Sequence, residues 1–231
     1  MDEWRSPAVT ELRVTETHRA PADSREVGVL LSIDTAMGSS VAVGTPARIV
    51  EVSSDDPRRH AEVIGDLIAR AYAEAGATPA ETTAVVVGIG PGPFTGLRVG
   101  IAAATAFATG RGIPLLPVQG HEGVALAVLE AGSVAQPRVL QDAKRRELFV
   151  TAYAGLDDAG IPQRRHDSSL LSRASLIDEP GDIWPTGIPA GQLVRLAERR
   201  LVSGRAFAPN RPLYLRQPDV QQPSAPKRVS T

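Results

Sequence analysis

The chain has 231 residues, of which 25 are Lys or Arg and 26 are Asp or Glu, so its formal net charge at neutral pH is -1. This balance excludes a global field that would attract nucleic acid or an anionic membrane, so any contact with RNA must be local or made by a partner. Cysteine is absent and only 4 % of the residues are aromatic, which excludes disulfides and thiolate sites and disfavours base-stacking platforms.

The two ends of the chain differ in composition from the region between them. Residues 1–26 are polar with little periodicity, and residues 217–231 are rich in Pro, Gln and Ser. We predict that both segments are disordered, and we assign no function to the first. No apolar run reaches the roughly 18 residues that span a bilayer, and residues 1–26 lack the apolar core of a signal peptide, so we expect a cytoplasmic protein.

The apolar patterns predict a first lobe over residues 27–120. A strongly apolar strand ends at Asp34, and an amphipathic helix stops at Gly76, a residue that commonly ends helices. In chain order, the predicted elements are strands at 27–33, 40–43 and 47–53, a helix at 57–75, a strand at 85–89, a helix at 95–109 and a strand at 115–118.

A second lobe is predicted over residues 121–216. Its expected elements are a helix at 121–131, strands at 139–141, 148–153 and 164–170, and a helix at 193–202. The stretch between Ser172 and Gly191 is short and contains DIWPTGIP, so we expect this lobe to be reduced.

Residues 84–110 form the most informative stretch of the chain. A β-branched run enters a helix through a loop in which Gly and Pro alternate, which predicts a strand-loop-helix unit. Gly96, Gly100 and Ala104 are spaced by four and share one helix face. Because such small residues let a second backbone approach closely, we expect a partner helix to pack there. The loop has neither a P-loop Gly-Lys-Ser/Thr nor a GxGxxG pattern, so its glycines alone do not predict phosphate binding.

The string GPGPFTGLRVG at residues 90–100 closely resembles the GPGSFTGLRIG signature of the TsaB (YeaZ) family. Looser likenesses to this family are the His-Ala-Glu of residues 60–62, DAKRRELF at 142–149 and PLYLR at 212–216. The resemblance implies an α/β protein with the two-lobe fold of actin-like ATPases and sugar kinases (ASKHA, RNase H-like), with the second lobe reduced.

Polar residues follow the first predicted strand, where kinases of this fold hold phosphates. Asp34, Thr35, Ser39 and Ser40 are therefore candidate nucleotide contacts. The segment IDTAMGSS lacks the basic residue and repeated glycine of a tight phosphate turn, so ordinary turn chemistry is the favoured interpretation. We expect no tightly bound cofactor, with ATP or ADP at a subunit interface as the alternative.

The histidines argue against a metal site. TsaD and its relatives hold a metal with two histidines four residues apart, and matching Glu122-Gly123 to that motif places the two ligand positions at Gly120 and Val124. Neither residue can bind a metal, and His121 is turned by about 100° on a helix. We therefore expect no metal and interpret His121 as a cap or surface residue. Without a GxSxG motif or a cysteine, no catalytic residue is predicted.

Two surfaces are candidates for contacts with other molecules. Lys144, Arg145 and Arg146 form a basic cluster that could meet RNA, but we interpret it as a solvated turn because no aromatic residues interleave with it. The predicted partner interface comprises His60, Ile64, Leu67, Gly96, Arg98, Gly100 and Ala104.

The resemblance implies a non-catalytic subunit that forms a heterodimer with a TsaD-like enzyme through helices of the first lobe. With a TsaE-like ATPase, such a pair transfers threonylcarbamoyl to adenosine 37 of tRNA (t6A), and tRNA would be reached only through the complex. Two alternatives stay open. One is an independent enzyme, either a phosphotransferase or an M22-type metallopeptidase, and the other is a self-associating regulatory protein that forms a homodimer when alone.

Overall fold

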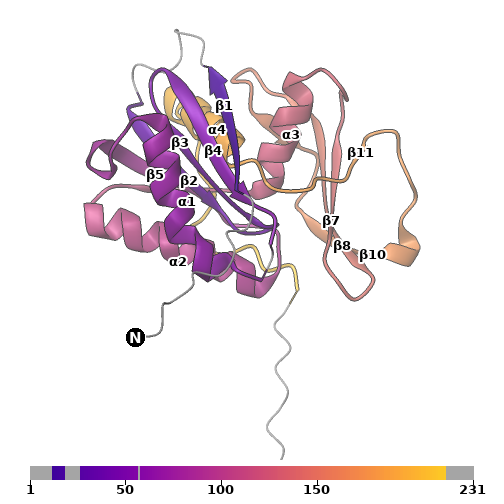
Figure 1. The fold of residues 1–231 in the computed structure, drawn as a ribbon. Coiled ribbons are helices and arrows are strands. Elements are labelled where there is room, and N and C mark those ends of the chain that lie inside the picture. Colours follow the sequence, from indigo (N-terminus) through magenta and orange to yellow (C-terminus); the bar gives the residue numbers. More distant parts are fainter. Residues whose placement is uncertain (1–11, 19–26, 57, 217–231) are drawn as a thin grey trace, which may run out of the picture.

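The computed structural model describes residues 12–18, 27–56 and 58–216 (Figure 1). Two β-sheets lie side by side, and helix α3 (Gly120–Glu130) follows the last strand of the first sheet and leads to the second. This mixed α/β arrangement agrees with the predicted fold class. None of the helices in the described part of the chain is long and apolar enough to cross a membrane.

The first sheet has six strands in the order β1-β4-β3-β2-β5-β6. Strands β2, β5 and β6 are parallel, whereas β2, β3, β4 and β1 are joined in antiparallel fashion. The strands are β1 (Arg13–His18), β2 (Val29–Asp34), β3 (Ser39–Gly44), β4 (Arg48–Ser54), β5 (Thr82–Gly88) and β6 (Leu115–Val118).

Helices cover both sides of the first sheet, because both faces of its central strands are apolar. Along β2, Leu31 and Ile33 face one core cluster while Leu30 faces the other, as the alternation of a strand requires. Helices α1 (His60–Ala75) and α2 (Phe94–Arg111) cover the first of these faces, and α4 (Ala190–Ser203) covers the second, with α3 packed against α4. The result is a three-layer lobe.

The second sheet is small, as predicted. Its strands follow the order β10-β8-β7-β11, and β9 pairs with β8. The strands are β7 (Arg138–Asp142), β8 (Glu147–Leu156), β9 (Pro162–Arg164), β10 (Ser169–Ser172) and β11 (Asp182–Ile183). The DI of DIWPTGIP forms β11, which pairs in parallel with β7, and the single strand expected at 164–170 is instead divided between β9 and β10.

Two expectations about the chain's organisation need correction. Residues 13–18 form β1, which pairs with β4 along its whole length, so the prediction of disorder for residues 1–26 is wrong for this segment. The rest of that range and the tail at 217–231 lie outside the described residues. Helix α4, which falls in the range predicted for the second lobe, packs on strands β2 to β6 of the first sheet.

Candidate functional site

Asp34 lies at the end of β2 and is 1 % exposed. Its Oδ1 accepts a hydrogen bond from the backbone N–H of Ala36 at 2.7 Å, while its buried Oδ2 has no hydrogen-bond partner among the described residues. Gly88 and Gly120 make room for this oxygen, since a Cβ on them would lie only 1.8 and 3.1 Å from it. Burial raises the pKa of Asp34 to about 7, the bond from Ala36 opposes the rise, and the charge of Glu51 adds to it.

The hydroxyl groups predicted to face a phosphate already have partners within the chain. Thr35 Oγ1 donates to the carbonyl of Gly96 at 2.7 Å and accepts from the N–H of Gly100 at 2.9 Å. Ser39 Oγ is 2.8 Å from His60 Nδ1, and Ser40 Oγ donates to the carbonyl of Ile188 at 2.6 Å. These contacts favour turn chemistry over nucleotide contact, which stays a prediction.

The Gly-Pro loop at residues 90–93 packs against the turn that follows β2. A Cβ on Gly92 would lie 2.8 Å from the Cβ of Ala36, so only glycine permits this approach. Gly90 has a φ of 101°, and its carbonyl accepts the N–H of Gly120 at 2.9 Å. The glycines thus serve close packing of three chain segments around Asp34.

The small-residue stripe of α2 faces the interior of the chain, which corrects the predicted interface. A Cβ on Gly96 would lie 2.5 Å from the Thr35 carbonyl oxygen, and one on Gly100 would lie 2.3 Å from Thr35 Oγ1. Ala104 is 0 % exposed. Of the other predicted interface residues, Leu67 is 0 % and His60 is 8 % exposed. None of these five offers a side chain to a partner, because each packs within its own lobe.

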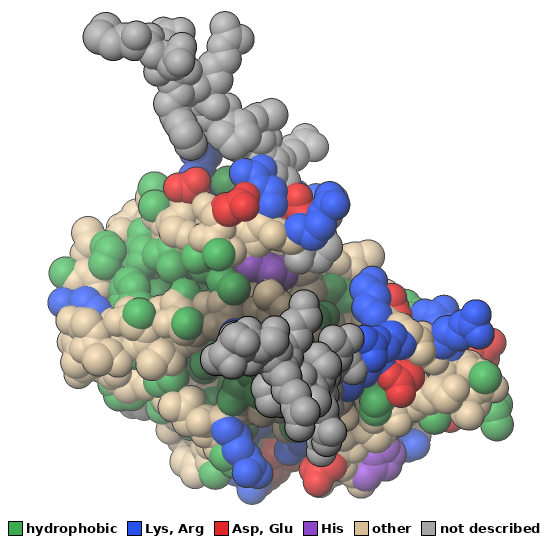
Figure 2. All heavy atoms as spheres, turned by 90° about the horizontal axis from the view of Figure 1, so that it is seen from below, with side chains coloured by type: hydrophobic (Ala, Val, Ile, Leu, Met, Phe, Trp, Pro, Cys, Tyr) green, Lys and Arg blue, Asp and Glu red, His purple; other side chains and the backbone are tan. Residues whose placement is uncertain are grey.

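Ile64 is half-buried and Arg98 is exposed. Ile64 lies on an outer face of α1 and α2 that was not predicted from the sequence. This α1–α2 face consists of half-buried and exposed small or apolar residues from both helices. Its members are Ala61, Ile64, Gly65, Ile68 and Ala69 of α1 and Val99, Ala102, Ala103 and Ala106 of α2. A Cβ on Gly65 would meet nothing within 4 Å, so a partner's backbone has room there. In Figure 2, hydrophobic side chains gather on the left, the side on which Figure 1 places α1 and α2.

His121 is fully buried, so its interpretation as a cap or surface residue is wrong. Its Nδ1 is 2.8 Å from Thr151 Oγ1, and its Nε2 is 3.0 Å from Gln141 Oε1. The amide of Gln141 in turn donates to the carbonyl of Ala36 at 2.9 Å. This network joins α3 and the second sheet to the turn beside Asp34. Burial lowers the pKa of His121 to about 4, against the opposing effect of Gln141, so the ring is neutral at physiological pH.

Replacing His121 with leucine should lower the free energy of unfolding by about 2 to 4 kcal/mol at pH 8, because it removes the partner of the buried Gln141 oxygen and one of the two partners of the Thr151 hydroxyl. The folded pKa of His121 lies below the ordinary 6.5, so its stabilising effect is present above pH 6.5 and is lost as the pH falls towards 4. The difference between variant and wild type should therefore shrink in urea unfolding at pH 4.5. The exposed His166, replaced by leucine, is the control, and a loss equal to that of His121→Leu would contradict the network's role.

The same network bears on metal binding. Both ring nitrogens of His121 already have side-chain partners. Gly120 has no side chain, and Val124 is apolar and 5 % exposed. These residues do not fit the two-histidine metal site of the TsaD motif, so we derive no metal-dependent step for this chain.

Three charged contacts hold the lobes and helices together, and sequence reasoning missed them because their partners are distant in the chain. Glu122 of α3 pairs with Arg200 of α4 at 2.8 Å and with Arg164 of β9 at 3.5 Å. Glu51 of β4 accepts the N–H of Gly191, at the start of α4, at 2.8 Å. Burial raises the pKa of Glu51 to about 7, and the bond from Gly191 opposes the rise.

Two motifs of the second lobe meet in space. The guanidinium of Arg216, from PLYLR, donates to the carbonyls of Ala143 at 2.9 Å and Lys144 at 3.2 Å and pairs with Glu147. All three acceptors belong to DAKRRELF, the segment that links β7 to β8. The end of the described chain thus holds this turn in place.

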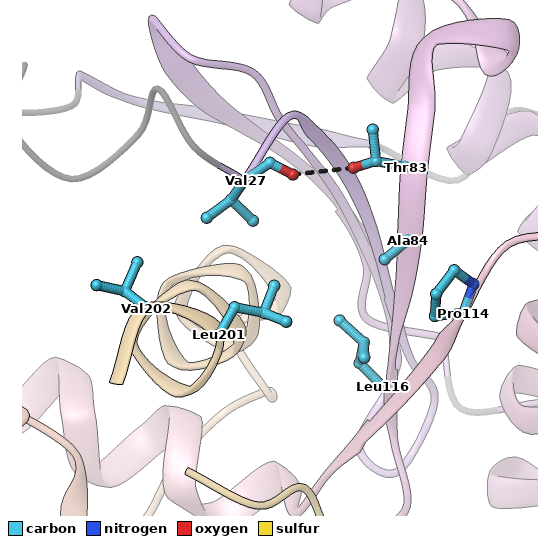
Figure 3. Close-up of a pocket in the computed structure, with 7 residues that line it drawn as sticks. All are labelled: Val27, Thr83, Ala84, Pro114, Leu116, Leu201 and Val202. Atoms are coloured by element: carbon cyan, nitrogen blue, oxygen red, sulfur yellow. Dashed lines mark hydrogen bonds between the residues drawn. The ribbon is translucent and has the colours of Figure 1, made fainter. Parts of the chain in front are cut away.

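A surface pocket of about 320 Å³ lies between the end of α4 and the first sheet (Figure 3). Leu201 and Val202 of α4 line one side, and Ala84 and Leu116 of β5 and β6 line the other. Thr83 has the only polar side chain among its described lining residues, and its hydroxyl donates to the Val27 carbonyl at 2.9 Å. With no further polar group to orient a ligand, we assign none to this pocket.

The chain is similar in sequence to several known proteins. Residues 52–163 match the family model described as TsaD, tRNA N6-adenosine threonylcarbamoyltransferase. An uncharacterized protein of Mycobacterium tuberculosis strain H37Rv is 33 % identical over 85 % of this chain and 95 % of its own length. The tRNA N6-adenosine threonylcarbamoyltransferase of Streptococcus pneumoniae strain CGSP14 is 32 % identical over 74 % of this chain, which spans about half (51 %) of that protein.

The fold has solved counterparts. YeaZ from Pseudomonas aeruginosa superposes with a TM-score of 0.71 at 21 % identity, over 81 % of this chain and 99 % of that one. A second structure, described as an uncharacterized protein with similarity to peptidase YeaZ from the same organism, gives a TM-score of 0.72 at 22 % identity over the same shares. The signature motif, the matched TsaD-family model and the fold agree, and the chain belongs to the TsaB (YeaZ) family.

Proposed function

We propose that this chain is the non-catalytic, TsaB-like subunit of an assembly that transfers threonylcarbamoyl to adenosine 37 of tRNA. A TsaD-like subunit would supply the catalytic site, and a TsaE-like ATPase would act on the pair. Family membership supports this role, as does the matched TsaD-family model. Around Asp34, the hydroxyls of Thr35 and Ser40 are engaged in hydrogen bonds within the chain, and the glycines serve close packing.

The observation that carries the proposal is the α1–α2 face. It presents small and aliphatic side chains on neighbouring helices, with Gly65 and Ala69 exposed on α1 and Ala102 and Ala106 exposed on α2. Two helices of a partner could pack closely against such a surface. An apolar face of this kind on a water-exposed pair of helices is typical of a protein interface. The TsaD-like subunit, which shares the fold, is the partner that the family relation favours.

Co-expression with the TsaD-like protein of the same cell tests this proposal. We expect the two chains to purify as a stable heterodimer, and we expect threonylcarbamoyl transfer only after the TsaE-like ATPase is added. The isolated chain should hold no stoichiometric metal by elemental analysis and show negligible ATPase activity. Transfer by the isolated chain would support an independent enzyme, and a homodimer that the TsaD-like protein cannot disrupt would support the self-associating alternative.

Replacing Ala69 or Ala106 with glutamate should weaken heterodimer formation at least tenfold, because a charge would be buried without a partner in the interface. Both side chains are exposed in the isolated chain, so the melting temperature of the isolated variants should stay within about 2 °C of the wild type. Isothermal titration with the TsaD-like subunit measures the affinity. Ala206→Glu, at an exposed residue beyond α4, is the control, and tight binding by both face variants would place the partner elsewhere.

A further inference from the structure

The turn between β7 and β8 contains three consecutive residues in the left-handed conformation. Lys144, Arg145 and Arg146 have φ angles of 63°, 53° and 61°. The N–H of Glu147 donates to the carbonyl of Lys144 at 3.0 Å, so Arg145 and Arg146 are the central residues of a tight turn with positive φ at both positions. Turns of this kind favour Asn-Gly, whereas arginine resists positive φ. This chain therefore places two arginines where other residues would give a more stable turn.

Strain at such a position points to a function when the surroundings hold it in place. Arg216 does so, because its bonds to the carbonyls of Ala143 and Lys144 fix the turn from outside the hairpin. The side chains of the three basic residues are exposed at the tip. In Figure 2, Lys and Arg side chains gather on the right, the side on which Figure 1 places β7, β8 and β10.

The fold brings an aromatic residue to this basic region. The N–H of Arg173 donates to the carbonyl of Arg146 at 2.8 Å, and the Arg173 guanidinium lies 5.5 Å from the ring centre of Trp184. Trp184 is 47 % exposed. Basic side chains and an exposed aromatic ring are thus neighbours, although Trp184 is some forty positions away from the turn in the sequence. The interpretation of the cluster as a plain solvated turn depended on the absence of such a ring.

We propose that this basic tip, defined as Lys144, Arg145, Arg146, Arg173 and Trp184, is a contact surface for the tRNA substrate of the assembly. The cations would meet backbone phosphates, and the Trp184 ring would stack on an unpaired base. Of the acidic neighbours of the tip, Asp142 is paired with Lys144 and Glu147 with Arg216. This inference rests on the proposed function, which supplies the RNA.

The double variant Arg145→Asn with Arg146→Gly separates this role from a structural one. It installs the residues that the turn geometry favours, so the melting temperature of the chain should rise. Its affinity for unmodified tRNA should nevertheless fall about tenfold or more at 0.1 M salt, and the slope of log K against log salt should become shallower by about 1.4 to 1.8, since each lost phosphate contact contributes 0.7 to 0.9. A purely structural turn predicts greater stability with unchanged binding.

Binding is measured both for the isolated chain and for its complex with the TsaD-like and TsaE-like partners. The charge-matched control Arg111→Gln with Arg205→Gln removes two exposed arginines from other elements and should leave tRNA affinity within about twofold. Trp184→Ala should weaken binding about fivefold or more, and Trp184→Phe should restore most of it.

The outcomes distinguish this inference from the proposed function. If the complex forms and transfers threonylcarbamoyl but the turn variant binds tRNA as tightly as the wild type, the proposed function stands and this inference is overturned. If no complex forms, the proposed function fails, and the tRNA affinity of the isolated wild type and turn variant still decides the inference. If the turn variant loses binding to vesicles of anionic lipid but keeps its affinity for tRNA, the tip is a membrane-contact surface and this inference is overturned.

Discussion

Replacing Gly100 with alanine is expected to lower the free energy of unfolding by about 1 to 3 kcal/mol, even though alanine favours helices over glycine. The added Cβ would lie 2.3 Å from Thr35 Oγ1, which is far inside contact distance. That hydroxyl cannot simply move away, because it bonds both to the carbonyl of Gly96 and to the N–H of Gly100. The substitution therefore forces α2 away from the turn after β2. Urea unfolding of the isolated chain measures the effect.

Gly110→Ala is a matched control in the same helix. A Cβ at this position would meet nothing within 4 Å, and Gly110 is exposed. The control should gain about 0.5 to 1 kcal/mol, since alanine lowers the conformational entropy that glycine loses on folding. Opposite signs at the two positions are thus expected. A Gly100→Ala variant as stable as the wild type would mean that α2 does not pack closely against Thr35. The stripe of Gly96, Gly100 and Ala104 would then again be a candidate partner surface.

Replacing Asp34 with asparagine is expected to stabilise the chain at pH 8, on the order of 2 to 4 kcal/mol relative to the wild type, and to have little benefit at pH 4. The folded pKa of Asp34 is about 7, well above the ordinary 3.8, because the carboxyl is buried. Between these values the folded state holds the proton more tightly than the unfolded state. The contribution of Asp34 to stability is therefore fully present below pH 3.8 and is lost as the pH rises through 7.

Thermal or urea unfolding of both proteins between pH 4 and pH 8 tests this expectation. Asparagine keeps an oxygen to accept the N–H of Ala36, so the turn survives the substitution. The effect of His121 on stability has the opposite sign over an overlapping pH range. Because His121 is present in both proteins, the difference between their free energies of unfolding reports the effect of Asp34. Glu51→Gln should show a similar trend, because burial also raises the pKa of Glu51 to about 7. A flat difference across this range would show that water reaches the Asp34 carboxyl.

The sequence predicts the first lobe well because its elements depend on local patterns. The apolar run before Asp34 and the glycine that ends the helix at Gly76 act over a few residues, and the structure places Gly76 in the left-handed conformation at that helix end. The small β9 and β11 strands were not predicted as separate elements, because three- and two-residue strands carry too little periodicity to be recognised.

The surroundings of the candidate site depend on distant contacts, and there the sequence is a weaker guide. Gly100 and Gly65 are both helical glycines, yet one packs against Thr35 and the other faces open space. Sequence spacing shows which residues share a helix face but not which face is turned inward. His121 illustrates the same limit, because its partners Thr151 and Gln141 come from strands that only the fold brings beside it.

The placement of β1 bears on how the first sheet meets other molecules. Strand β4 has β3 on one side and β1 on the other, so its backbone groups are used on both sides. A shortened chain that began at Val27 would leave the outer N–H and C=O groups of β4 unpaired, and those groups would accept a strand from another chain. In the full chain that position is occupied from within, with Arg13 paired to Asp55 and Arg48 paired to Glu16 at the rim. Strand β1 therefore forms the edge of the sheet in place of β4, and its charged residues Arg13 and Glu16 are of the kind that disfavours pairing with a strand of another chain.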